Sequence, residues 1–250
     1  MTADSDNRTS ELIALLSHEL RTPMTSLQGS IELLRTGKLG ELSEFGEKLL
    51  EIAAHNTDRL TQLVGDILVW YQLSCGESVL FRQPCNVVEL IYQVYEDIYP
   101  LAADKQIQLQ IVTPPSLSIV ADSEQLSHVL HHLLHNAIKF SAPDSQVSLT
   151  AERVDQPLAD WIESPYLLIA VRDQGIGIAV EQFEQIFQPF QQLDASNQRE
   201  QGGLGLGLAL CQGIVQQHQG KIWLESVVGL GSCFFVALPI ESDDKTSSDY

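Results

Sequence analysis

Apolar residues recur at intervals of three or four along the first third of the chain. One series comprises Leu12, Leu16, Leu20, Met24, Leu27, Ile31 and Leu34. A second comprises Phe45, Leu49, Ile52, Leu60, Leu63, Ile67 and Trp70, with Asn56 as a polar member. This spacing places each series along one side of an α-helix. The break "TGKLGELS" contains two glycines, so the pattern predicts two helices joined as an antiparallel hairpin.

A two-helix hairpin does not bury both of its apolar stripes by itself. Pairing with a second copy of the chain covers them, which predicts a homodimer built around a four-helix bundle. Residues 8–75 are assigned to this dimerisation hairpin, and "SCGES" at residues 74–78 is interpreted as a hinge.

Beyond the hinge, the pattern changes to a mixture of strands and helices. Helices are expected at residues 86–105, 121–141 and 206–220, with Asp122 or Ser123 as the cap of the second. Strands are expected at 107–112, 146–154 and 166–173, followed by a terminal hairpin at 221–240. The order predicts an α/β domain over residues 76–241, and residues 242–250 are expected to be disordered.

Composition narrows the range of partners. Fourteen Lys and Arg against 33 Asp and Glu give a net charge of −19, which argues against binding nucleic acid. No apolar run is long enough to span a membrane, and the polar start "MTADSDNRTS" does not resemble a signal peptide. The four cysteines are widely spaced, as expected for reduced thiols in a cytoplasmic protein. The chain also fits the cytosolic part of a longer or membrane-associated sensor.

Three segments of the second domain carry candidate chemistry. In "DQGIGI", Gly175 and Gly177 allow the backbone to approach a flat ligand, and Asp173 offers an acceptor for an exocyclic amine. In "QGGLGLGLAL", glycines precede a helix, so backbone N–H groups converge on an anion site. Each segment, taken alone, also fits an ordinary turn.

The third segment is "HNAIKF", where Asn136 and Lys139 stand three residues apart on one side of a helix. An amide oxygen is a hard ligand suited to Mg²⁺, and a lysine contacts phosphate as a point charge. The competing interpretation is a solvated polar face on an amphipathic helix.

The order of these segments, with a phenylalanine-rich stretch at residues 183–190 between the glycine motifs, resembles the ATP-binding domain of the GHKL superfamily. The stretch "SHELRTP" at residues 17–23 resembles the phosphoacceptor box of sensor histidine kinases of two-component systems. The resemblance covers about residues 10–240 and implies a Bergerat-type α/β sandwich after the hairpin.

The resemblance implies a role for each matching residue. It implies that His18 is phosphorylated by ATP and that Glu19 is its acid/base partner. It implies that Asn136 binds Mg²⁺, that Lys139 contacts phosphate and that Asp173 accepts from adenine. It also implies glycine positions in the nucleotide loop and lid, namely Gly175, Gly177, Gly203, Gly205 and Gly207.

Phosphoryl transfer from His18 to an aspartate of a response regulator, on a separate protein, is implied as well. Thr22 completes an H-E-x-x-T pattern, which in this family accompanies phosphatase activity toward that regulator. A hydroxyl one helical turn beyond His18 is suited to orienting a water molecule.

Two positions depart from the family pattern. His132 stands where a second asparagine is usual, and Leu204 replaces a hydroxyl residue of the lid. These departures support an alternative, in which the chain is a degenerate kinase that acts as an ATP-independent binding module. A second alternative is a GHKL ATPase that drives a conformational clamp, but it leaves the His-Glu box unexplained. His128, His131 and His135 share the helix of His132, and exposed or hydrogen-bonded histidines explain them better than a metal site does.

Overall fold

The computed structural model describes residues 23–37, 40, 42–75, 80–157, 165–191 and 204–240. The chain divides into two compact units. The first contains residues 1–78 and 201–204, and the second contains residues 79–200 and 205–250. His18, Glu19, Thr22 and Gly203 lie outside the described residues, as does the predicted C-terminal tail.

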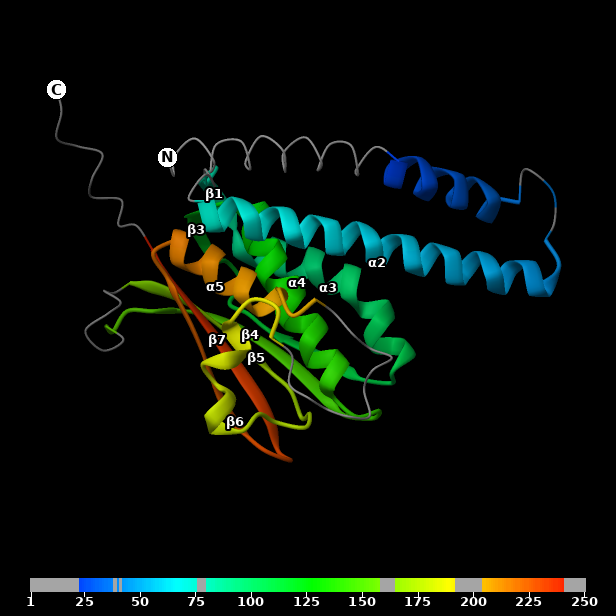
Figure 1. The fold of residues 1–250 in the computed structure, drawn as a ribbon. Helices are drawn as coiled ribbons and strands as arrows, with labels where there is room; N and C mark the ends of the chain where they lie inside the picture. Colours follow the sequence, from blue (N-terminus) through cyan, green and yellow to red (C-terminus); the bar gives the residue numbers. More distant parts are fainter. Residues whose placement is uncertain are drawn as a thin grey trace, which may run out of the picture. The chain divides into compact units, whose positions relative to one another are not determined.

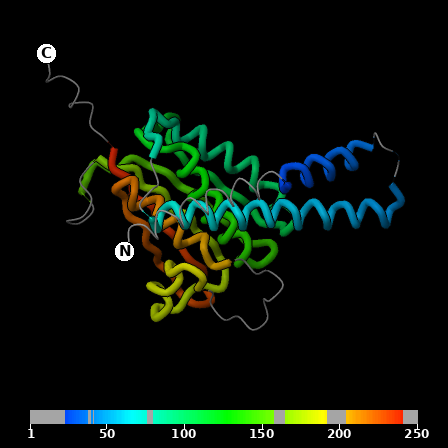
Figure 2. Tube along the Cα trace, turned by 45° about the horizontal axis from the view of Figure 1, so that its top comes forward, coloured from blue at the N-terminus to red at the C-terminus, as the bar shows by residue number. Residues whose placement is uncertain are grey.

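The first unit is helical, as its apolar spacing predicts. A helix over residues 23–35 is followed by α2 (Glu44–Cys75), and the two run side by side in Figures 1 and 2. The Gln28 side chain donates to Asp58 Oδ1 across this pair at 3.0 Å. The new helix begins where the Ser43 hydroxyl accepts from the Gly46 N–H at 3.2 Å, which supplies a partner for a free main-chain donor.

The second unit is a mixed α/β domain with a main sheet of five strands in the order β2-β4-β5-β7-β6. Only the β2–β4 pair is parallel, and the other neighbours are antiparallel. Its strands are β2 (Gln108–Val112), β4 (Gln146–Val154), β5 (Tyr166–Arg172), β6 (Lys221–Val227) and β7 (Gly231–Pro239). Its helices are α3 (Val87–Asp104), α4 (Ser123–Phe140) and α5 (Gly207–Gln217).

The three helices lie on one face of the main sheet (Figure 1). Successive side chains of a strand point to opposite faces of the sheet. In β5, Leu167, Ile169 and Val171 on the helix-covered face are fully buried, while their neighbours on the other face are less buried. On that second face, Trp223 of β6 stacks on Phe235 of β7 with ring centroids 5.1 Å apart. The result is the α/β sandwich that the family resemblance implies.

Side chains cap the starts of two helices of the second unit, and of these caps only that of α4 was predicted. Asn86 accepts from the Glu89 N–H at the start of α3, and Asp122 accepts from the Gln125 N–H at the start of α4. A short two-stranded sheet, β1 (Gln83–Asn86) paired antiparallel with β3 (Ser118–Ala121), was not predicted. Helix α5 is also shorter than predicted and ends at Gln217, because Gln219 adopts a left-handed φ of 60°.

Short 3-10 turns, η2 (Val180–Gln182) and η3 (Gln185–Phe187), occupy the phenylalanine-rich stretch. In the part of the chain that the structure describes, no helix combines the length and the apolar character that a membrane span requires.

Candidate functional site

Helix α4 carries Asn136 and Lys139, and the surrounding residues fix its position. Its apolar side is packed into the core through Leu126, Val129, Leu130, Leu133, Leu134, Ala137 and Ile138. Asn136 and Lys139 lie outside this buried side and are half-buried. At the C-terminal end, Lys105 Nζ donates to the carbonyls of Ile138 and Lys139 at 3.1 and 2.8 Å. A cation at this end of the helix also interacts favourably with the helix dipole.

The Lys139 ammonium lies 5.0 Å from the centroid of the neighbouring Phe140 ring. This is cation–π distance, so the aromatic face holds the ammonium near the last turn of α4. The amide of Asn136 and the charge of Lys139 therefore belong to one anchored stretch of helix.

Asp173 directly follows β5 and is 7% exposed. Its Oδ1 accepts from the Gly175 N–H at 2.8 Å and from the Ser232 N–H at 3.1 Å. Burial raises the pKa of this carboxyl, and the two main-chain donors partly oppose the shift. Among the residues that the structure describes, no hydrogen bond goes to Oδ2, so this oxygen is able to accept one from a ligand.

The loop that follows Asp173 requires glycine at two positions. A Cβ on Gly175 would lie 2.6 Å from the carbonyl oxygen of Phe140, at the end of α4. Gly177 has a φ of +68°, and a Cβ there would collide with the Val227 carbonyl. Because a short bridge also joins Ser141 to Gly175, the Asp173 loop lies directly against the end of α4.

The second glycine segment contacts α4 at His132, about two turns nearer the N-terminus of the helix than Phe140. Gly205 has a φ of +71°, and its carbonyl accepts from the Phe190 N–H at 3.0 Å. Gly207 is the first residue of α5, and a Cβ there would lie 3.0 Å from His132 Nδ1. Leu206, the N-cap residue of α5, offers no side-chain acceptor to the first N–H groups, and N–H groups at a helix start can bind an anion.

The structure thus places Gly175 and Gly207 against α4, the helix that carries Asn136 and Lys139. Gly177 lies against Val227 and Gly205 against Gln191, so these two glycines do not contact α4 directly. Asn136 lies between the position where His132 meets Gly207 and the position where Phe140 meets Gly175. An anion at the start of α5 and a flat ring at Asp173 would therefore lie on either side of the Asn136 turn.

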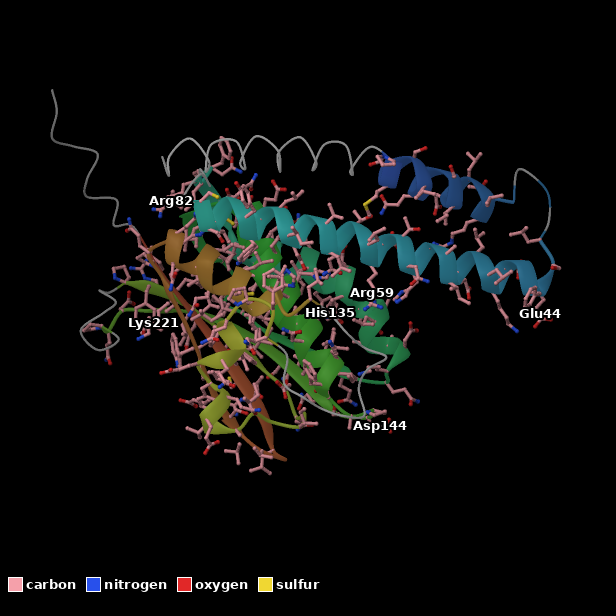
Figure 3. The ribbon with its side chains drawn as sticks, in the orientation of Figure 1. Glu44, Arg59, Arg82, His135, Asp144 and Lys221 are labelled. Carbon is pink, nitrogen blue, oxygen red and sulfur yellow. The ribbon has the colours of Figure 1, made fainter. Side chains whose placement is uncertain are left out.

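The histidines of α4 are neighbours rather than an evident metal centre. The rings of His131 and His135 stack with centroids 6.3 Å apart (His135 is labelled in Figure 3). The pKa of His135 is lowered to about 4, first by burial and then by the charges of His131, Lys139, His132 and Lys105. No group of three potential metal-binding side chains occurs among the described residues.

The sequence did not predict several contacts that shape the site. The contact of His132 with Gly207 pairs residues 75 positions apart, and the Ser226 and Ser232 hydroxyls lie in strands whose alternation looks ordinary. Phe183 and Phe187 are half-buried and Phe190 is 55% exposed, so these phenylalanines do not form one uniform core group.

Two family models match the chain. The His Kinase A (phospho-acceptor) domain matches residues 8–76, and the ATPase domain described as histidine kinase-, DNA gyrase B- and HSP90-like matches residues 121–242. The chain belongs to the sensor histidine kinases. Its ATPase match includes α4, the Asp173 loop and both glycine segments, so the site described above lies within the family's ATP-binding domain.

Curated relatives agree with this assignment. This histidine kinase chain is 35% identical over 232 residues to the circadian input-output histidine kinase CikA of Synechococcus elongatus, covering 92% of the chain and 30% of that protein. It is 34% identical over 233 residues to the alginate biosynthesis sensor protein KinB of Pseudomonas aeruginosa, covering 92% of the chain and 37% of KinB. The chain therefore spans about a third of the length of these relatives.

Solved structures of histidine kinases have the same fold. Full-length ShkA in complex with AMPPNP has a TM-score of 0.72 and 28% identity, covering 93% of this chain and 46% of ShkA. The catalytic domain of ThkA has a TM-score of 0.54 and 27% identity, covering 64% of this chain and 95% of that domain. These similarities support the predicted combination of a helical region and a GHKL-type domain.

Proposed function

We propose that this chain is the catalytic core of a homodimeric histidine kinase. It transfers the γ-phosphoryl group of ATP to His18 and then to an aspartate of a response regulator, a separate protein. It also dephosphorylates that regulator with the help of Thr22. The observation that carries the proposal is the convergence of Asp173, Asn136 and the start of α5 on one helix, in a chain whose N-terminal part matches a phosphoacceptor domain.

The binding half of the proposal follows from the chemistry of each group. A buried carboxylate with one free oxygen suits the exocyclic amine of adenine, and the glycines of its loop let the ring approach the backbone. The N–H groups at the start of α5 and the Lys139 ammonium suit the phosphates. The neighbour ShkA, whose structure contains an ATP analogue, supports the same choice of nucleotide.

Asn136 is proposed to ligate Mg²⁺. A single amide oxygen fits this ion, because Mg²⁺ keeps several waters and takes further ligands from nucleotide phosphates. When bound, the ion offsets negative charge on the transferring phosphoryl group. The protein's own contribution is to hold Asn136 and Lys139 on an anchored helix, where they orient the phosphates.

The transfer step uses the lone pair of a neutral imidazole. One ring nitrogen of His18 attacks the γ-phosphorus while the bond to the β–γ bridging oxygen breaks, and ADP leaves with that electron pair. The proton on the other ring nitrogen passes to Glu19, which stabilises the positive charge that develops. The product is a phosphohistidine that an aspartate carboxylate on the regulator attacks in the second step.

Dimerisation is proposed to occur through the helical unit. Helix α2 buries none of its residues in the single chain. Its apolar series remains largely exposed, with Phe45 at 71%, Leu49 at 51% and Ile52 at 58%. Side chains of this kind in a regular helical stripe are typical of a bundle that is completed by a second copy.

Phosphotransfer profiling tests the proposal. The chain is incubated with Mg²⁺ and ATP labelled on the γ-phosphate, and a panel of purified receiver domains is then added. We expect label on the kinase first and then, rapidly, on one or few receivers. Label on neither, despite nucleotide binding, would support the degenerate-kinase alternative, and phosphate release without labelled protein would support an ATPase.

The same panel tests Thr22. Thr22→Ala is expected to retain self-labelling and to slow the loss of label from the receiver. Thr25→Ala, at the next threonine in the sequence, serves as the matched control. Equal loss of both activities in Thr22→Ala would contradict the assigned role.

A further inference from the structure

The hairpin formed by β6 and β7 meets the Asp173–Ile178 loop through a pair of serines. We propose that Ser226 is a positioning residue, whose hydroxyl holds this loop in the conformation that binds the nucleotide. The inference rests on the proposed function, since it concerns the same nucleotide site.

Three hydrogen bonds meet at the Ser226 hydroxyl. It accepts from the Ile178 N–H at 2.8 Å, donates to the Gly231 carbonyl at 2.9 Å, and lies 3.0 Å from the Ser232 hydroxyl. A serine hydroxyl has one proton and two lone pairs. Since the proton of Ser226 is used toward Gly231, Ser232 donates to Ser226, and the hydrogen-bonding capacity of Ser226 is filled.

This arrangement fixes the far end of the loop. The Ile178 N–H is held by a side chain, while the neighbouring Ile176 carbonyl accepts from the Gly229 N–H at 2.8 Å. Gly177, between them, lies against the Val227 carbonyl with its left-handed φ. Three consecutive loop residues are therefore tied to the end of β6 and the turn that follows.

The near end of the loop is tied to the same hairpin through Ser232. The Ser232 main chain donates to Asp173 Oδ1 at 3.1 Å and accepts from the Asp173 N–H at 2.9 Å. The contact between the two hydroxyls links this end to Ser226. Loss of the Ser226 hydroxyl would thus free the Ile178 end and weaken the connection to Asp173.

A purely structural role makes a different prediction. If Ser226 only stabilised the end of the sheet, its removal would lower the melting temperature and leave nucleotide recognition by the folded protein unchanged. A positioning role changes nucleotide affinity and the selectivity for the amine that Asp173 accepts, with little effect on kcat.

The test compares Ser226→Ala with wild type in the full chain. Kd is measured by calorimetry for a non-hydrolysable ATP analogue, and KM and kcat are measured with ATP and with ITP, which lacks the exocyclic amine. We expect Kd and KM for ATP to rise about tenfold, the effect of one lost hydrogen bond. We expect kcat to change less than twofold and the preference for ATP over ITP to fall.

Further variants sharpen the test. Ser226→Thr keeps the hydroxyl and is expected to restore affinity, and Ser232→Ala is expected to have a smaller effect because it retains the main-chain bonds to Asp173. Ser118→Ala, an exposed serine of β3, is the matched control and should leave affinity unchanged. If Ser226→Ala does not fold, Ser226→Cys replaces it and is compared with Ser226→Thr.

An unchanged Kd and an unchanged ATP-to-ITP ratio in Ser226→Ala, or in the cysteine variant that replaces it, would overturn the inference and leave the proposed function intact. A wild-type chain that binds no nucleotide would overturn both. A Kd that rises equally in Ser226→Ala and Ser118→Ala would also overturn the inference, because the effect would then be a general consequence of losing a strand hydroxyl.

Discussion

At the scale of single residues, the two oxygens of Asp173 have different partners. Oδ1 is held by the Gly175 and Ser232 N–H groups, whereas Oδ2 is the acceptor proposed for the adenine amine. This division predicts the result of a nearly isosteric substitution. In Asp173→Asn, the amide oxygen must stay toward the two main-chain donors, so the amide NH₂ takes the position of Oδ2.

In Asp173→Asn, the amide NH₂ therefore faces the exocyclic amine of adenine, and both groups are donors. We expect Kd for ATP to rise about a hundredfold, because a hydrogen bond to a charged group is lost and a repulsive contact replaces it. The melting temperature at pH 7.5 is expected to stay the same or to rise. Burial raises the pKa of Asp173, so its charge opposes folding above that pKa, and the neutral amide removes this cost. Calorimetry and thermal unfolding check both parts.

The raised pKa of Asp173 also determines how the affinity for ATP changes with pH. As the pH falls through the raised pKa of Asp173, the carboxyl takes up a proton, and the wild-type affinity for ATP is expected to fall. Asp173→Asn should have a flatter affinity profile than wild type when both are measured in the same buffers, since titration of the nucleotide itself is common to both. A profile in the variant that is as steep as in wild type would contradict this role for Asp173.

At the scale of elements, His218 connects the end of α5 to the start of α4. Its Nε2 accepts from the Asp122 N–H at 3.1 Å, so its Nδ1 carries the proton donated to the Ile214 carbonyl at 2.8 Å. Asp122 in turn caps α4 and accepts from the Phe81 N–H at 3.0 Å. A buried neutral histidine thus joins the end of α5 to the start of α4 and to the segment that leads into β1.

This arrangement makes the stability of the domain sensitive to acid. Burial is the largest cause of the lowered pKa of His218, the charge of Arg82 adds to it, and the Ile214 hydrogen bond and the Asp122 charge oppose it. Because the unfolded chain binds the proton more readily, stability is lost as the pH falls below the ordinary histidine value of about 6.5. His135 has a lowered pKa as well and adds an effect of the same sign.

We expect His218→Gln to lose about 2 kcal/mol of stability at pH 7.5, since two buried hydrogen bonds are disturbed. Its melting temperature should fall less steeply than that of wild type between pH 7 and pH 5. Thermal unfolding over this range measures both effects, and His55→Gln, an exposed histidine of α2, is the control. An unaltered slope in His218→Gln would show that this group does not cause the acid sensitivity.

The sequence predicted those parts of the fold and the site that depend on residues close together in the chain. Helices α3 and α4, with the Asp122 cap, follow from local periodicity and capping chemistry, and so do β4, β5 and the β6–β7 hairpin. The β1–β3 sheet pairs short segments about 35 residues apart, one of which contains Pro84, so no local alternation marks it.

In the site, too, contacts between segments distant in the sequence were not predicted. The glycines and Asp173 were recognisable because the order of their segments resembles the GHKL pattern. At Gly175 and Gly177 the structure adds a close backbone approach that favours glycine. The contacts of His132 with Gly207 and of Ser226 with Ile178 depend on how distant segments meet. Such contacts were not predictable from one sequence, since a histidine on a helix and a serine in a strand have many ordinary roles.

At the scale of the whole molecule, the exposed stripe of α2 leads to an expectation about assembly. Leu49→Glu places a charge in the apolar series, and burying it between two copies would be costly. We expect the wild-type chain to sediment as a dimer and Leu49→Glu to sediment as a folded monomer at micromolar concentration. Gln62→Glu adds the same charge at an exposed position outside the series and should remain dimeric. A variant as dimeric as wild type would place the interface elsewhere.

The central claim is that a single imidazole, His18, receives the phosphoryl group from ATP. The most direct measurement incubates the purified chain with Mg²⁺ and γ-labelled ATP, then locates the modification by mass spectrometry under alkaline conditions. The account predicts a phosphoryl group on His18 that is stable to base, is lost in acid and is absent from His18→Gln, while His55→Gln is labelled normally. A nucleotide-saturated dimer that never acquires this phosphohistidine, or a His18→Gln variant that is labelled as fully as wild type, would contradict it.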